Sequence, residues 1–368
     1  MKVEDIHDLL PSSQVADIAS KKPVGITSEK LVEMALHPDN PEYQGFTRIL
    51  LASHSLVMSG EKLFELVFQF FKTHSNKPNS DNFIRSVFFF LETWTEDFFS
   101  EFKELTEVHQ KIQNLANTAK QDYFSIYFEH PFCDKFLENQ NKQKQENLPT
   151  TPEELIDFEG DGFDVIEMDT LEFTLQMTLI EFQLFKQIRV AEFIGSSWNK
   201  PDKKKLAPNI CKSISHFNKI SNWVRYEILT ETNPKRRVKL IKKFIDIAQH
   251  LQSIGNFNGL FQIMSALHSA PIIRLKQSFA SLSSRYSQLL KNLASVFISK
   301  DNYATLRQTL SRFQPPIIPY LGMYLTDLTF LEEGNSSWIE TENEKVINLN
   351  KVTMMGKCLA DLVWFRRR

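Results

Sequence analysis

One stretch of sequence decides the interpretation of this chain. It reads Pro319-Tyr320-Leu321-Gly322-Met323-Tyr324-Leu325-Thr326-Asp327-Leu328-Thr329-Phe330-Leu331-Glu332-Glu333-Gly334-Asn335. A short, mostly apolar helix is predicted to begin near Pro319, where a proline loses no hydrogen bond, and to stop at Gly334-Asn335. The two final carboxylates, Glu332 and Glu333, face the negative end of the helix dipole at a cost of about 0.3–1 kcal/mol. That cost is explained either by a functional carboxylate or by a solvated helix end.

The composition indicates packed helices. The chain has 368 residues, 42% hydrophobic and 24% charged, with 31 phenylalanines and only 11 glycines. Length alone favours two to three domains. A net charge of −2 gives no basic field for nucleic acid. The three cysteines are far apart, which makes zinc unlikely to be bound and favours a reducing compartment.

Helical spacing of apolar residues recurs along the chain, whereas two-residue alternation is rare. The first half is expected to hold helices over 27–36, 46–56, 61–71 and 83–102. In the second half, apolar positions predict helices over 175–188, 241–251 and 257–267. The fold class is therefore predicted to be all-α, in two helical domains.

A polar stretch separates these halves. Residues 139–147 are nearly devoid of apolar side chains, and prolines and acids follow them. Such a segment cannot bury enough surface to offset its ordering entropy. We expect a flexible N-terminus over 1–20, a first domain over 21–136, a linker over 137–160 and a second domain over 161–368.

The motifs of common enzymes are absent from the sequence. There is no P-loop, no Gly-rich dinucleotide motif, no nucleophile elbow and no HExxH spacing. Neither a metal site nor a cofactor is expected. No signal peptide and no apolar run of membrane-spanning length is seen. The residues by themselves favour a helical binding protein over a hydrolase.

Several clusters in the second half occur in a characteristic order. They are Thr178–Phe185, Glu192–Gly195 with Trp198, Pro208–Ile210, Phe217–Val224, Asn256–Leu260, Ser265–Leu275 and finally Pro319–Asn335. Their order and spacing resemble the catalytic domain of Ras-family guanine-nucleotide exchange factors, over about residues 165–368. The first half is similar to the companion Ras exchanger motif, on the matches 27–33, 46–51, 61–66 and 91–94.

The resemblance implies a mechanism without covalent chemistry. In this family two consecutive helices form a protruding hairpin that wedges into the nucleotide site of a small GTPase. The first of these helices would be Pro319–Glu333. Glu333 matches the carboxylate that competes for the phosphate-binding loop, and Thr329, four residues earlier on the same face, matches the position that occludes magnesium.

The resemblance also implies residues that bind the GTPase or support the hairpin. Tyr320 matches an aromatic position that packs against the second switch; core packing is the alternative. His268, Ile273 and Lys351 are expected in the surface that faces the GTPase. Asn256 and Asn258 are expected to brace the hairpin or to cap a turn, as asparagine does through nearby backbone groups.

Two positions depart from the family pattern. His268 stands where asparagine is usual, so it could alter partner choice or keep a hydrogen bond. After Ile347-Asn348-Leu349 the usual basic run retains only Lys351, and 352–355 read Val-Thr-Met-Met. These apolar residues either bury a surface that is charged elsewhere or bind a different partner.

The expected partner is a Ras-subfamily GTPase of the Ras, Rap or Ral type. Neither nucleic acid nor stable membrane insertion is expected, and a second, allosteric GTPase is left open. The protein is predicted to be cytoplasmic and transiently recruited to membranes that carry its GTPase. The alternative functions are a GTPase-binding scaffold without exchange activity and a helical adaptor.

Overall fold

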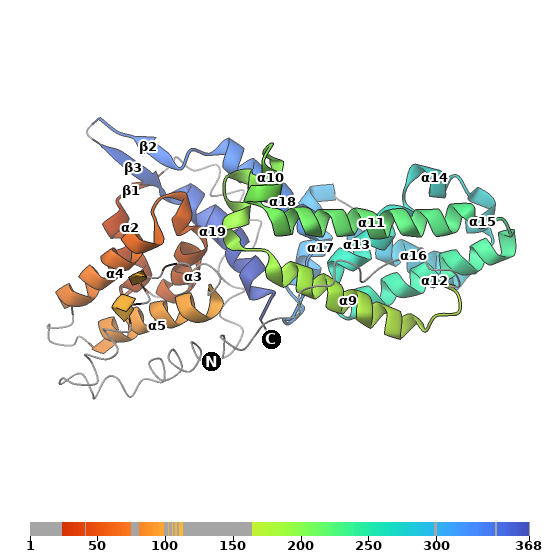
Figure 1. Cartoon of the computed structure of the whole chain (residues 1–368), viewed down its shortest axis with the longest axis horizontal. Coiled ribbons are helices and arrows are strands. Elements are labelled where there is room, and N and C mark those ends of the chain that lie inside the picture. Colours follow the sequence, from red (N-terminus) through yellow and green to blue (C-terminus); the bar gives the residue numbers. More distant parts are fainter. Residues whose placement is uncertain are drawn as a thin grey trace. The chain divides into compact units, whose positions relative to one another are not determined.

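The computed structural model describes residues 24–40, 42–74, 81–98, 102, 105, 107–108, 110–112, 164–297, 300–342 and 344–367. These residues are predominantly α-helical, which confirms the predicted fold class (Figure 1). The predicted N-terminal tail (1–20) and linker (137–160) lie outside the described residues.

The contacts divide the chain into two compact units. The first consists of Met1–Thr150, Arg189–Ser196 and Asp327–Trp364, and the second of Thr151–Ile188, Ser197–Thr326 and Phe365–Arg368. The first unit thus contains segments from both halves of the sequence. The domain limits expected from sequence stay predictions.

The first unit is built on a close contact between an early and a late helix. Its helices are α2 (Ser28–Leu36), α3 (Tyr43–Ser53), η2 (His54–Leu56), α4 (Gly60–His74), α5 (Asp81–Asp97) and α19 (Leu349–Trp364). α19 packs on α3. A Cβ at Gly356 would lie 2.5 Å from the Ile49 carbonyl oxygen, so only glycine allows this approach.

The apolar residues that replace the family's basic run belong to this packing. Val352, Met354 and Met355 are fully buried in α19. Of the two alternatives for these residues, the structure favours burial over an exposed partner surface.

A small antiparallel sheet completes the first unit. β1 (Gly25–Ile26), β3 (Lys345–Asn348) and β2 (Trp338–Glu340) lie in the order β1-β3-β2. In the register, Gly25 pairs with Asn348 and Trp338 with Ile347. The sheet therefore connects the start of the described chain to the segment that precedes α19.

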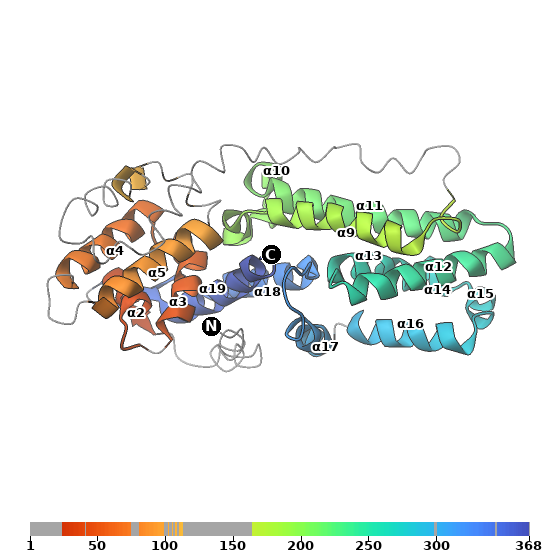
Figure 2. The same cartoon turned by 90° about the horizontal axis from the view of Figure 1, so that it is seen from below.

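The second unit surrounds one buried helix. It contains α9 (Thr170–Gln187), α10 (Lys203–Leu206), α11 (Pro208–Thr230), α12 (Pro234–Ser253), α13 (Phe257–Leu267), α14 (Ala270–Ile273), α15 (Lys276–Ala280), α16 (Ser284–Phe297) and α17 (Lys300–Leu310). Nearly every residue of α13 is buried. α9, α11, α12 and α16 all contact it (Figure 2). The 3-10 segment η4 (Val190–Asn199) and α18 (Leu321–Gly334) run from one unit into the other.

Helix boundaries follow local signals. The Asp169 carboxylate caps α9 by accepting from Glu172 N at 2.8 Å. Asn233 caps α12, with Pro234 in the first turn. The helix predicted from Pro319 begins at Leu321 and ends at Gly334, as the glycine indicates.

The described residues contain neither a membrane-spanning helix nor a metal-binding group of side chains. None of the helices in the described ranges is long and apolar enough to span a bilayer. Within the same ranges no group of three or more His, Cys, Asp or Glu side chains could hold a metal ion.

Candidate functional site: the acidic end of α18 and an aromatic surface

Glu333 lies in the last turn of α18 and is exposed. Its carboxylate forms no hydrogen bond or ion pair with any other described residue. Thr329, one turn earlier, is partly exposed. A carboxylate that folding does not use is therefore available at the end of this helix.

Phe330 extends the exposed face of α18. Its side chain is 70% exposed, three residues before Glu333 and therefore on the same side of the helix. Sequence reasoning assigned no role to this residue. Its signal was a large aromatic side chain placed between two predicted site residues, Thr329 and Glu333.

Glu332, the acid next to Glu333, is paired with a lysine. Lys351 Nζ donates to Glu332 Oε1 at 3.0 Å and to the Glu332 carbonyl oxygen at 3.4 Å. Lys351 is only 2% exposed. A direct contact of Lys351 with a GTPase would require this pair to open, and that contact stays a prediction.

The turn after α18 is held by asparagines. Asn335 Nδ2 donates to the Leu331 carbonyl oxygen at 3.2 Å. Asn348 Nδ2 donates to the Ser336 carbonyl oxygen at 2.8 Å, and its Oδ1 accepts from Lys351 N at 3.3 Å. Asn348 therefore links the residues after α18 to the start of α19.

Tyr320 belongs to an aromatic cluster in the second unit. Its ring stacks on Phe261 with centroids 4.0 Å apart, and the rings of Tyr303 and Phe217 each lie 5.9 Å away. Burial, followed by the neighbouring Tyr303, raises the pKa of Tyr320 to about 12. The phenol is therefore neutral at physiological pH and can donate a hydrogen bond.

The same cluster reaches His268. Phe297 lies 5.1 Å from Phe261 and stacks on the exposed ring of His268 at 5.3 Å. His268 Nδ1 lies 3.0 Å from the Met264 carbonyl oxygen. Tyr320 and His268 thus belong to one aromatic cluster, connected through the buried Phe261 and through Phe297.

Ile273 lies apart from these stacked rings. It ends the short helix α14 and is 53% exposed. α14 contacts α13, the helix that carries Phe261. The structure therefore places Ile273 on an element next to the helix that carries part of the aromatic cluster.

Asn256 and Asn258 lie at the start of α13, which holds the segment that leads into α18. Asn256 Oδ1 caps α13 through Gly259 N at 2.8 Å, and its Nδ2 donates to Thr178 Oγ1 at 3.0 Å. The backbone N–H groups of Phe257 and Asn258 donate to the Ile318 carbonyl oxygen at 2.8 and 3.2 Å. Ile318 lies two residues before Tyr320, so this bracing fixes the approach to the helix.

A buried acid network lies behind this brace. Glu181 is 2% exposed and accepts from Asn258 Nδ2 at 2.5 Å and from Gln262 Nε2. His216 Nε2 lies 3.1 Å from Glu181 Oε1, the oxygen that accepts from Gln262. Sequence reasoning gave Glu181 no role, although an acid between apolar residues of a buried helix face needs partners.

Comparison with known proteins identifies the domain. Residues 172–353 match the RasGEF domain, so the chain contains a RasGEF catalytic domain. It is 35% identical over 291 residues to Ras guanine nucleotide exchange factor P of Dictyostelium discoideum, covering 77% of this chain and 18% of that protein.

Two further relatives are similar over most of this chain. Identity is 29% to Ras guanine nucleotide exchange factor A of the same organism, over 96% of this chain and 60% of that protein. Identity is also 29% to Ras-specific guanine nucleotide-releasing factor 2 of Mus musculus, over 75% of this chain and 23% of that protein. The chain thus spans less than two thirds of the length of each of these three relatives.

Proposed function

We propose that this chain is a guanine-nucleotide exchange factor that accelerates GDP release from a Ras-subfamily GTPase. The observation that carries the proposal is the contrast between two adjacent acids. Glu332 is paired with Lys351, whereas Glu333 is exposed and unused by the fold. An acid left available at the end of a helix, inside a RasGEF domain, supports a role in exchange.

The mechanism is a competition for the nucleotide site. α18 and α19 would form the hairpin that enters this site. The Glu333 carboxylate would bind the lysine and hydroxyl groups that otherwise hold phosphate and magnesium, and it would repel the phosphates. Thr329 would occupy the space of the magnesium ion. The catalyst accelerates release of GDP and GTP alike because it binds the empty GTPase best.

Docking would use the exposed members of the aromatic cluster. Tyr320 and His268, connected through Phe261 and Phe297, offer stacking area to the second switch of the GTPase. Ile273 would add an exposed apolar contact. Asn256 and Asn258 would support the hairpin by fixing the chain that leads into α18.

The remaining parts of the proposal concern context. The helices α2 to α5 would form a Ras exchanger motif domain that braces the hairpin, and a second GTPase at an allosteric site is left open. The GTPase would be of the Ras, Rap or Ral type. The protein would be cytoplasmic and recruited transiently to the membrane that carries this GTPase.

The test is release of a fluorescent GDP analogue from a panel of Ras, Rap and Ral GTPases. Wild type should accelerate release from at least one, and Glu333→Ala should abolish the acceleration. Glu340→Ala, an exposed acid in β2, is the matched control. Tight binding without acceleration would instead indicate the scaffold, and failure to bind any nucleotide-free GTPase would indicate an adaptor.

A further inference from the structure

A buried lysine needs partners for its charge. Among the described residues, both partners of the Lys351 ammonium belong to one residue: the carboxylate of Glu332 at 3.0 Å and its backbone carbonyl oxygen at 3.4 Å. Lys351 is in the first turn of α19, and Glu332 is in the last turn of α18. The contact therefore joins the end of one helix to the beginning of the next.

This contact addresses the two electrostatic problems of the helix end. The last carbonyl groups of a helix have no intrahelical partner, and acids there oppose the helix dipole. Lys351 supplies a donor to one such carbonyl group and a positive charge beside the Glu332 carboxylate. Lys351, a residue of α19, thus offsets the electrostatic cost of placing Glu332 at the C-terminal end of α18.

The geometry also fixes the direction of Glu333. Successive residues of an α-helix point about 100° apart, so a Glu332 side chain held toward Lys351 leaves Glu333 directed elsewhere. Glu333 is exposed, consistent with this arrangement. If Glu332 were released, the last turn would lose a restraint and could fray, as helix ends do.

Lys351 is itself held in place. Its backbone N–H donates to Asn348 Oδ1 at 3.3 Å, and Asn348 Nδ2 donates to the Ser336 carbonyl oxygen at 2.8 Å. The contacts therefore form a closed ring: Glu332 is followed along the backbone by Ser336, Ser336 is bonded to Asn348, Asn348 to Lys351, and Lys351 back to Glu332. The end of α18 is restrained from both sides of the turn that follows it.

We propose that Lys351 is a positioning residue, which acts through Glu332 to orient Glu333 rather than by touching the GTPase. This inference rests on the proposed exchange function. It differs from direct binding in a measurable way, because a residue that acts through Glu333 changes the exchange rate, whereas a residue that touches the GTPase also changes the affinity for it.

The kinetic test uses Lys351→Met, Glu332→Gln and both combined, in wild type and in Glu333→Ala. Each single change should lower the maximal exchange rate about 10-fold, with little change in the half-saturating GTPase concentration. The double variant should be no worse than the singles, and none of the changes should weaken the binding of Glu333→Ala to a nucleotide-free GTPase. Lys351→Arg should retain much of the rate, since it keeps the charge.

An additive double variant, or a Lys351→Met effect confined to the half-saturating concentration, would show direct contact and overturn the proposal. The matched control is Lys30→Met, which breaks the exposed 3.0 Å pair with Glu33 in the same unit. It should leave the exchange rate unchanged. Thermal unfolding of every variant identifies any rate loss that merely follows loss of fold.

A second measurement does not depend on exchange activity. In hydrogen–deuterium exchange, Lys351→Met and Glu332→Gln should each deprotect the amides of 331–335, whereas Lys30→Met should not. Unchanged protection would overturn the positioning role even if the protein proves to be a scaffold. Deprotection together with no exchange by wild type would contradict the proposed function alone.

Discussion

Tyr320 stacks on Phe261 with the two ring centroids 4.0 Å apart and the ring planes 17° from parallel. Phe261 is fully buried in α13, whereas Tyr320 stands just before α18. This stack joins the core helix of the second unit to the segment that leads to Glu333. Tyr320 therefore has a packing role, which was the alternative considered from sequence, together with its proposed role in docking.

The stack depends on a glycine. A Cβ at position 322 would lie 2.4 Å from Tyr320 Oη, so Gly322→Ala should push the ring off its site. Overpacking costs about 1–3 kcal/mol, and the better helix propensity of alanine returns about 1 kcal/mol. We expect a small loss of thermal stability and a several-fold higher half-saturating GTPase concentration. Adding Tyr320→Phe, which removes Oη, should recover part of the binding; no recovery would contradict ring displacement.

The Tyr320 phenol predicts a stability change at high pH. Its pKa is raised from 10 to about 12 by burial and by Tyr303. Between these values the unfolded chain loses this proton and the folded chain keeps it, so stability present below pH 10 should fall as pH rises toward 12. Over this pH range, wild type should lose about 2 kcal/mol at most of its free energy of unfolding relative to Tyr320→Phe. Absorbance titration of the phenols checks it: the variant should lack one late-ionising tyrosine.

Glu181 should be important for stability. Glu181→Ala removes the acceptor of Asn258 Nδ2 and Gln262 Nε2 and the neighbour of His216. Leaving buried donors unpaired should lower the free energy of unfolding by about 3 kcal/mol. Urea denaturation measures this change. Gln176→Ala, an exposed position on α9, should stay within about 0.5 kcal/mol of wild type; an equal loss there would contradict a specific network effect.

Periodicity was sufficient to predict several of the helices because apolar spacing is a local property, but α11, α16 and α17 were not predicted. The helix expected over 257–267 is α13 to the residue, and α18 ends at Gly334 as expected, although neither Gly334 nor Asn335 adopts the left-handed conformation. The short sheet was missed, since strands of two to four residues carry too little alternation to be recognised. Its pairing of 25–26 with 347–348 is set by long-range packing alone.

The site was predictable in part. The exposed Glu333 and the capping role of Asn256 follow from local sequence together with the family pattern. The burial of Lys351 does not, because a lysine side chain is rarely buried and is expected on an exposed surface. Only the approach of two helix ends brings it to Glu332. Likewise, the partners of Glu181 come from two other helices, α11 and α13, and have no common sequence signal.

Phe330 gives the last prediction. An aromatic ring 70% exposed beside Glu333 contributes little to folding, so Phe330→Ala should change the free energy of unfolding by less than about 0.5 kcal/mol. If α18 enters the nucleotide site of a GTPase, however, the ring becomes buried there. Loss of a buried aromatic contact should then lower the exchange rate by about 10-fold or more. Stopped-flow release of a fluorescent GDP analogue measures this effect.

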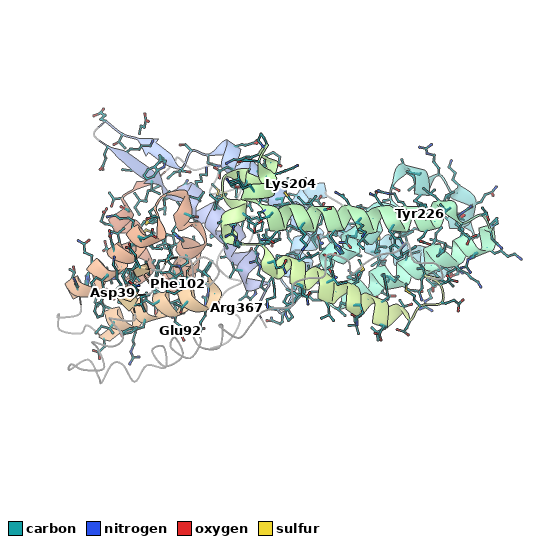
Figure 3. All side chains as sticks on the ribbon, in the orientation of Figure 1. Asp39, Glu92, Phe102, Lys204, Tyr226 and Arg367 are labelled. Carbon is teal, nitrogen blue, oxygen red and sulfur yellow. The ribbon has the colours of Figure 1, made fainter. Side chains whose placement is uncertain are left out.

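The matched control is Tyr226→Ala, which removes an equally exposed aromatic ring (65%) from α11 (Figure 3). It should leave both stability and exchange rate unchanged. Glu333→Ala separates the two contributions at the helix end: the charge should act on release of the nucleotide, and the ring on the affinity for the empty GTPase. If Phe330→Ala exchanges as fast as wild type while Glu333→Ala is inactive, the carboxylate enters the site without the ring, and the approach of α18 must be tilted away from Phe330.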